Sequence, residues 1–314
     1  MDGTYTRAYT AGPLVIGGSS AFNLDGIDNQ SVDPGTDLLT ILGAGEYQPT
    51  FAAVPSVTPK IKLVTTDIKT ALDNGIWLTG FAIPQTTVYT TVDLYLTKIA
   101  KLGARSGASS NVRCRITNGM IIPRTLSVTD GKPAMLTLDI IPIWDATTAP
   151  IVFTDSTSIP HTPTIDEAWW LGPAAINGTT IDSLQGFTLD FGIKEILERN
   201  SGEFYASYVA IESIRPTITF ENRDSLQMNT YTLIGTAQGA TDSVAYLQQG
   251  VKNGTRTAAA SSAHISLTVD DGIITVGDTG GGNDGAHTSK LIMTPTYDTS
   301  NAIIVKATTA AITI

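Results

Sequence analysis

The feature that most constrains this chain is an internal repeat, because a duplicated sequence requires that one fold be built twice. Residues 45–67 align without gaps on residues 202–224, at an offset of 157. The identical pairs in this block are Gly45/Gly202, Glu46/Glu203, Ala53/Ala210, Ser56/Ser213, Pro59/Pro216, Ile61/Ile218 and Asp67/Asp224. Conservative replacements such as Tyr47/Phe204 lie between them. The sequence therefore predicts two domains with the same fold.

Further matches run in the same order along both halves. Residues 95–96 match 246–247, residues 142–145 match 295–298, and residues 21–28 match 175–182. The offsets of 151, 153 and 154 differ slightly, as expected where loops differ in length. Pro160 and Pro163 favour an extended connector between the copies. We therefore predict a first domain at residues 1–162 and a second at 163–314, each long enough to bury a core.

Alternating apolar and polar residues predict a mainly β fold. Such alternation occurs at residues 60–64, 91–96, 113–116 and 136–141, and each stretch has a counterpart in the second half. Asx-Gly pairs suit the turns between strands, and they stand at residues 118–119, 130–131, 177–178 and 271–272. We predict two tandem copies of a two-sheet sandwich or barrel-like domain.

One short helix is expected in each copy. Asp67 can cap a helix over residues 68–72, and Asn74-Gly75 provides a stop signal. Asp224 holds the capping position in the second copy.

The charge balance argues against a protein that grips nucleic acid. The chain of 314 residues has 19 Lys and Arg against 29 Asp and Glu, a net charge of −10. Phosphate binding needs clustered cations, which this chain does not show. The first residues predict no signal peptide, and no run of about 18 apolar residues predicts a membrane span.

Residues with catalytic or ligating potential do not form a recognisable pattern. Cys114 is the only cysteine, and burial in a core is a more common fate for it than activation by its flanking arginines. The histidines His161, His264 and His287 lack neighbouring ligands at metal-site spacing. No nucleophile elbow, P-loop or dinucleotide fingerprint occurs. The sequence predicts no catalytic, cofactor or metal site and no enzymatic activity.

Three other features have a functional reading beside a structural one. The Gly-rich stretch 278–285 could fold around calcium, but it lacks the tandem repeat of such sites, so a hairpin loop is favoured. The sequons at Asn177 and Asn253 read as turns. Trp169 and Trp170 are adjacent, so one is expected in a core and the other in a contact; a sugar-stacking platform is the alternative.

The order of elements resembles the tail tube proteins of long-tailed bacteriophages. In each copy a Gly-rich opening, as at residues 172–178, is followed by a Gly-Glu segment and a strand after proline, as at residues 215–220. A short capped helix follows, and each copy closes on strands of the Gly-Ile-Ile and Pro-Ile-Trp-Asp type. The resemblance covers both halves through diffuse patterns.

The resemblance implies a structural role in a virion tail that is assembled in the host cytoplasm. Three duplicated chains would form a pseudo-sixfold ring, and stacked rings would form a tube through which DNA passes without specific binding. Partners would be further copies of the chain and other tail proteins such as the tail tip, terminator and tape measure, with no membrane. A tail-tip hub or distal tail protein is the nearest alternative, and a carbohydrate-binding β-sandwich module is a more distant one.

Assembly into rings also predicts segments that are poorly anchored in a single chain. The Gly-, Ala- and Ser-rich stretches 103–110, 254–262 and 278–288 contain few apolar residues, so we expect them to be mobile in a monomer.

Overall fold

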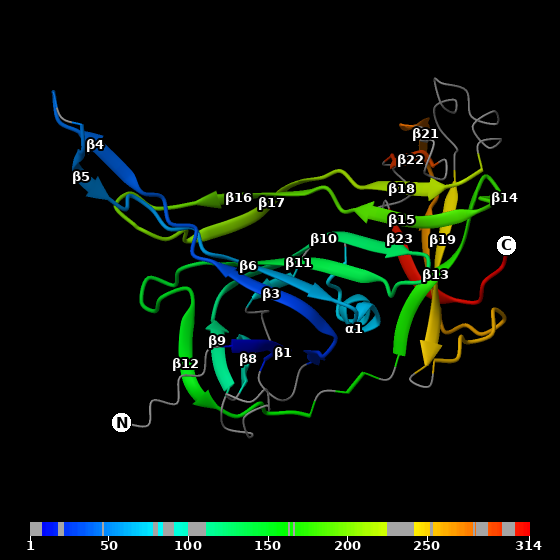
Figure 1. Ribbon diagram of the computed structural model, residues 1–314, viewed down its shortest axis with the longest axis horizontal. Helices are drawn as coiled ribbons and strands as arrows, with labels where there is room; N and C mark the ends of the chain where they lie inside the picture. Colours follow the sequence, from blue (N-terminus) through cyan, green and yellow to red (C-terminus); the bar gives the residue numbers. More distant parts are fainter. Residues whose placement is uncertain are drawn as a thin grey trace.

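The protein is mainly β, with several sheets and one short helix in the part that the structure describes (Figure 1). The computed structural model describes residues 8–17, 22–45, 47–77, 81–83, 91–99, 111–162, 164–165, 167–224, 242–251, 254–278, 280, 288–296 and 305–314. The first-half elements are β1 (Ala8–Ile16), β2 (Phe22–Leu24), β3 (Ile27–Asp33), β4 (Leu39–Leu42), β5 (Pro49–Ala53), β6 (Lys60–Thr65), α1 (Ile68–Asp73), β7 (Phe81–Ile83), β8 (Val92–Ile99), β9 (Asn111–Ile116), β10 (Gly119–Thr129), β11 (Met135–Pro142) and β12 (Val152–Thr157). The second-half elements are β13 (Glu167–Ile176), β14 (Thr179–Thr180), β15 (Leu184–Asp190), β16 (Ile193–Glu198), β17 (Tyr208–Ile214), β18 (Thr217–Asn222), β19 (Ser243–Val251), β20 (His264–Val269), β21 (Gly272–Val276), β22 (Ser289–Pro295) and β23 (Lys306–Ala310).

The largest sheet runs across both halves of the chain. Its strand order is β21-β22-β18-β15-β10-β11-β6-β3, and β7 pairs with the first residues of β10. All these pairings are antiparallel. The two halves meet where Thr125–Thr129 of β10 pair with Gly186–Asp190 of β15. We refer to this sheet as the central sheet.

Each half also contributes a five-stranded sheet of its own, which we call an outer sheet. The first has the order β12-β9-β8-β1-β2 and the second the order β14-β13-β19-β20-β23. The two outer sheets lie toward opposite ends of the central sheet in Figure 1. Side chains from all three sheets belong to one buried apolar cluster, in which Trp77 of the first half meets Phe191 of the second at a ring-centroid distance of 5.1 Å. The core therefore continues across the boundary between the halves.

Two hairpins leave the central sheet. The β4–β5 hairpin projects beyond the rest of the molecule at one end, and the β16–β17 hairpin extends toward the same side (Figure 1). Both begin after an Asp-x-Gly turn in which the glycine has positive φ. Gly35 has φ 57° and donates its N–H to Asp33 at 2.9 Å, while Gly192 has φ 56° and donates to Asp190 at 2.9 Å.

Alternation in the sequence located several strands correctly. The predicted strands at 60–64, 91–96, 113–116 and 136–141 correspond to β6, β8, β9 and β11. The helix predicted over 68–72 is α1, which ends at Asn74 before Gly75 with φ 76°. Asp67 occupies the N-cap position of α1 as predicted, but its side chain makes no cap hydrogen bond and accepts the N–H of Asp25 at 3.2 Å. The corresponding helix after Asp224 falls on residues 225–241, which lie outside the described residues.

The upstream alignment of residues 21–28 with 175–182 does not match the strand positions. Asn177 occupies the turn between β13 and β14 with φ 49°, whereas Asn23 lies within β2 opposite Val15. The strands instead align Gly12-Pro13 of β1 with Gly172-Pro173 of β13, because both strands have a register shift there. An added Cβ on either glycine would meet a backbone oxygen at 2.7 Å, that of Tyr95 or Tyr246.

Candidate functional site

The reactive residues singled out in the sequence occupy structural positions where the structure describes them. Cys114 is buried in the core with 1% of its surface exposed, which confirms the structural interpretation, and burial raises the pKa of its thiol to about 12. Such a thiol is a poor nucleophile, because the thiolate is the reactive form.

The two described histidines make hydrogen-bonding contacts within the fold. His264 is fully buried, accepts the N–H of Gln249 at 3.1 Å through Nδ1, and lies 2.9 Å from the Ala258 oxygen through Nε2. These bonds fix a neutral imidazole that donates from Nε2. His161 contacts the Asp25 carboxylate at 2.6 Å, and His287 lies outside the described residues.

The two tryptophans point to different environments, as expected. Trp169 is buried with 1% exposure, whereas Trp170 is half-buried and has the Arg256 guanidinium 6.0 Å from its ring centroid. A ring covered by a cation on one face has less surface to offer a sugar.

The stretch proposed as a hairpin loop or calcium loop continues the β21–β22 pair. Gly280 and Thr288 form an antiparallel bridge beyond β21 and β22, and Asp278 is exposed. Residues 279 and 281–287 lie outside the described residues. Within the described part of the chain, no group of three or more His, Cys, Asp or Glu is arranged to hold a metal ion.

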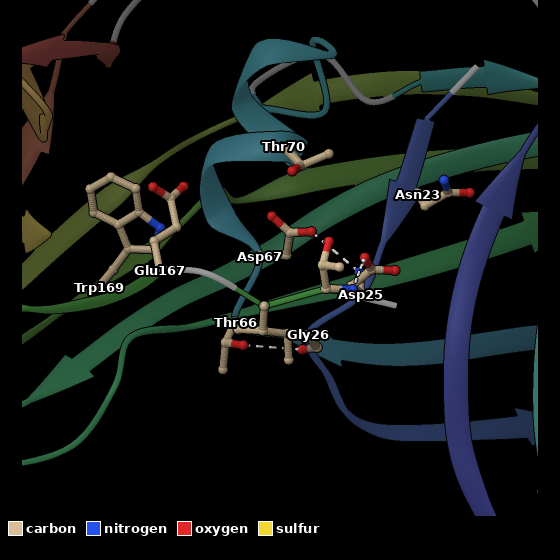
Figure 2. Close-up of a pocket in the computed structure, with 10 residues that line it drawn as sticks. Asn23, Asp25, Gly26, Thr66, Asp67, Thr70, Glu167 and Trp169 are labelled. Carbon is tan, nitrogen blue, oxygen red and sulfur yellow. Dashed lines mark hydrogen bonds between the residues drawn. The ribbon is translucent and has the colours of Figure 1, made fainter. Parts of the chain in front are cut away.

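A cavity of about 240 Å³ lies where the connector between the halves passes the start of α1. Figure 2 shows the carboxylates of Asp25 and Asp67 near each other, with Glu167 and Trp169 arriving from β13. Asp25 accepts the Thr164 N–H at 2.9 Å and contacts His161, so its carboxylate ties the connector to the first half. This geometry joins the connector to the first half of the chain.

The most elaborate polar site is the junction between the halves. Arg124 of β10 donates to Asp139 of β11, to the Ile193 oxygen and to Glu195 of β16, each at 2.6 Å. Lys60 lies 2.9 Å from Asp139 and 3.6 Å from Glu195. Burial by itself raises the pKa of Glu195, but the hydrogen bond and charge of Arg124 outweigh burial and lower the pKa overall. We call Lys60, Arg124, Asp139 and Glu195 the junction cluster.

The end of the β16–β17 hairpin also docks on the first half. The N–H of Val57 donates to the Phe204 oxygen at 2.8 Å, and the N–H of Trp144 donates to the Ala206 oxygen at 2.8 Å. The rings of Trp144 and Tyr205 lie 6.2 Å apart. The second half thus contacts the first along β10 and also through the tip of its β16–β17 hairpin.

The hairpin of the first half, β4–β5, makes no such backbone contact with the second half among the described residues. β3 and β21 are the two ends of the central sheet in the described residues. The β4–β5 hairpin exposes a series of large apolar side chains: Leu38, Leu39, Ile41, Leu42, Tyr47, Phe51 and Val54. Tyr47 is fully exposed and Leu38 is 66% exposed. Paired edges and covered apolar surface are normal for a stable fold, so the edge of β3, the residues that follow β21 at Asp278 and Gly280, and the apolar β4–β5 hairpin form the candidate functional site.

Sequence reasoning did not identify this site, because no single residue type marks it. A signal was present in the density of apolar residues between Leu38 and Val54, which no helix or core assignment used. The expectation of mobility for residues 254–262 is wrong. Thr257 donates its backbone N–H to Gln249 at 2.9 Å and Ala259 accepts the N–H of Ile312 at 2.8 Å, so this loop is fixed by its own half. Residues 103–110 lie outside the described residues.

Comparisons with known proteins do not assign a family to the chain. No model of a known protein family matches the chain, and no curated protein sequence matches it. Among the described residues, no helix has the length and apolar character needed to cross a membrane.

Proposed function

We propose that this chain is a structural subunit of a bacteriophage tail tube, in which three chains form a ring of six domains and the rings stack. The observation that carries the proposal is the central sheet, whose two end strands in the described residues are the counterparts, by order in the sequence, of the two strands that pair within the chain. β3 corresponds to β15, and β21 corresponds to β10.

Similar strand orders in the two halves support a tandem duplication. The first outer sheet has the order β12-β9-β8-β1-β2, and the second, read from its other end, has the order β23-β20-β19-β13-β14. In the central sheet, the order β10-β11-β6-β3 parallels β21-β22-β18-β15. Corresponding strands follow one another in the same sequence order, and each half has one hairpin in the same place. In a duplicated sandwich domain, the two sheets of each copy would enclose the core that they share.

Open edges that match paired strands support closed assembly. A surface that fits a different surface on an identical copy forms a head-to-tail contact, and such contacts close into a ring when the rotation permits. Here the β10–β15 pairing supplies the contact within the chain, and the continuation of β21 at Asp278 and Gly280, the counterparts of Thr125 and Ser127, would make the same contact with β3 of the next copy. Three chains would then make six similar junctions, three within chains and three between them.

The low content of basic residues supports a conduit for DNA. The chain has a net charge of −10, and a surface without a cationic stripe does not retain phosphates. We therefore expect no retardation of duplex DNA by the assembled protein at about 150 mM salt.

Electron microscopy and native mass spectrometry test the proposal. We expect oligomers in multiples of three chains and filaments with true threefold and apparent sixfold symmetry. A monomer at high protein concentration, with no filaments under any assembly condition, contradicts the tube. Threefold rings that never stack would favour the tail-tip hub.

A further inference from the structure

The junction cluster has apolar or small counterparts at the open edges. The positions that correspond to Arg124 and Asp139, at an offset of 153, are Gly277 and Ile292. At an offset of 157, Lys60 and Glu195 correspond to Thr217 and Leu38. Four charged residues are thus replaced together, and the set that replaces them carries no charge.

These replacements are complementary in size as well as in charge. Gly277 and Ile292 are both partly exposed on the β21–β22 edge, and Gly277 has no side chain where Arg124 places its guanidinium stem. Leu38, at the base of the β4–β5 hairpin, is 66% exposed. A leucine against a glycine and an isoleucine removes apolar surface from water without leaving a charge unpaired.

The tip of the β4–β5 hairpin also has a matching surface, which lies around Ile214 in the second half. In the first half, Val57 receives the β16–β17 hairpin through its backbone N–H. The counterpart of Val57 is Ile214, and because Arg215 N–H points to Gly192 across the β16–β17 pair, the N–H of Ile214 points away from that pair.

A hollow of about 510 Å³ lies beside Ile214 and is lined by Gly192, Lys194, Glu212, Ser213 and Arg215. The equivalent place in the first half is where the hairpin tip of the second half docks. The tip of the β4–β5 hairpin at Tyr47, which is fully exposed, corresponds to Phe204.

We propose that the β4–β5 hairpin of one copy lies across the β21–β22 edge of a second copy, with Leu38 against Gly277 and Ile292 and the Tyr47 tip in the hollow beside Ile214. The part of the contact between chains at Leu38 is therefore apolar, whereas the equivalent part within each chain, at the junction cluster, is ionic. This inference rests on the proposed ring and specifies the chemistry of its joint.

The pairing within the chain also sets the register between chains. Ser127 pairs with Thr188, and their counterparts are Gly280 and Ser31. The bonds from Phe191 to Arg124 and from Asp130 to Gln185 make Ser127 and Thr188 a non-hydrogen-bonded pair. The Cα atoms of such pairs lie about 4.5 Å apart, which is close enough for a disulfide between cysteines.

A charge transplant tests the apolar contact. Leu38→Glu should raise the protein concentration needed for assembly at least about tenfold, because a carboxylate would face an apolar edge. Adding Gly277→Arg should restore assembly, since the pair then reproduces Glu195 and Arg124. A Cβ at Gly277 meets Lys290 Cβ at 3.1 Å and Ile292 Cδ1 at 3.2 Å, so the arginine requires the Ile292 side chain and the strand at Lys290 each to shift by a few tenths of an ångström. Phe153→Glu, at a side chain 55% exposed on an outer sheet, is the matched control and should leave assembly unchanged.

Cysteine pairing tests the register independently of stability. Cys114 is the only native cysteine and is buried, so Ser31→Cys and Gly280→Cys can be prepared as separate proteins. A Cβ at Gly280 has nothing within 4 Å. After oxidation, a mixture of the two proteins should give a covalent dimer that neither protein gives alone.

The outcomes separate this inference from the proposed function. Threefold rings without the mixed dimer, or a dimer of Ser31→Cys alone, overturn the inference and leave the tube intact. A mixed dimer in a protein that never closes into threefold rings supports the inference and overturns the tube. Loss of assembly in Leu38→Glu that Gly277→Arg does not restore, with assembly lost equally in Phe153→Glu, also overturns the inference.

Discussion

Replacing Arg124 by methionine should destabilise the junction between the two halves more than any exposed ion pair would predict. The arginine has three donor contacts of 2.6 Å, to Asp139, to Glu195 and to the oxygen of Ile193. Methionine keeps much of the side-chain length but removes every donor. The two carboxylates would remain close together on adjoining elements.

The structure sets the size of the effect. The side chains of Asp139 and Glu195 are only 9% and 16% exposed, and removing one partner from a buried charge pair costs about 3–5 kcal/mol. Lys60 remains 2.9 Å from Asp139 and 3.6 Å from Glu195, so part of the charge stays compensated. We therefore expect Arg124→Met to lower the free energy of unfolding by about 2–3 kcal/mol.

Urea denaturation monitored by circular dichroism and tryptophan fluorescence measures this change, since urea leaves the ion pairs unscreened by salt. Lys290→Met is the matched control, because the Lys290–Glu221 pair at 3.1 Å has side chains 44% and 48% exposed. Exposed pairs of this kind contribute about 0–1 kcal/mol. Coincident transitions from both probes are required before a single free energy is assigned.

A loss no larger for Arg124→Met than for Lys290→Met would refute the reasoning. A second variant sharpens the test by replacing the whole junction cluster with its counterparts, as Lys60→Thr, Arg124→Gly, Asp139→Ile and Glu195→Leu together. Because no buried charge is then left alone, this variant should lose less stability than Arg124→Met. A quadruple variant that unfolds more easily than the single variant would contradict the argument.

Three further predictions concern separate parts of the fold. Cys114, whose pKa burial raises to about 12, should resist alkylation by iodoacetamide at pH 8 in the folded protein and react fully in urea; rapid labelling without denaturant would contradict the structure. Burial is the main cause that raises the pKa of Asp67 above its ordinary 3.8. The folded state then binds this proton more tightly, so the ionised form costs stability above about pH 4 and the cost disappears as the pH falls through the raised pKa. Asp67→Asn should therefore raise the urea midpoint at pH 7 and lose that advantage in acid, and equal midpoints at pH 7 would oppose this. Gly192→Ala should cost about 2 kcal/mol or more, because φ is 56° and the new Cβ would meet the Arg215 oxygen at 1.9 Å. Gly178→Ala, with φ 71° and open space around it, should cost about 1 kcal/mol, and similar losses for both would show that the close approach is unimportant.

Local patterns in the sequence predicted the strands and the helix well. Alternation located β6, β8, β9 and β11 to within three residues at each end, because each strand buries one face. Asn74-Gly75 marked the end of α1 correctly, since a glycine with positive φ is a strong local signal. The short range of these interactions makes them readable from neighbouring residues alone.

The arrangement of the sheets could not be predicted from local sequence patterns. The pairing of β10 with β15 joins residues about 60 positions apart, and the residues around Thr125 and Asp190 carry no local pattern that identifies the paired strand. The docking of Arg124 on Ile193 and Glu195 depends on that pairing, so the junction cluster was equally hidden. The mismatch at Asn23 and Asn177 shows the same limit, because a gapped alignment of short motifs can favour the wrong register.

The pairing of β10 with β15 within one chain has a kinetic consequence. That contact forms while the chain folds, so its strength does not depend on how much protein the cell contains. In a ring of three such chains, half of the junctions are complete before two molecules meet, and only the contacts at β3 and β21 obey mass action. The closed ring then contains three contacts between molecules, where six separate single domains would need six. The proposed joint between chains should accordingly govern the onset of assembly with rising concentration, while the junction cluster connects the two halves of each chain.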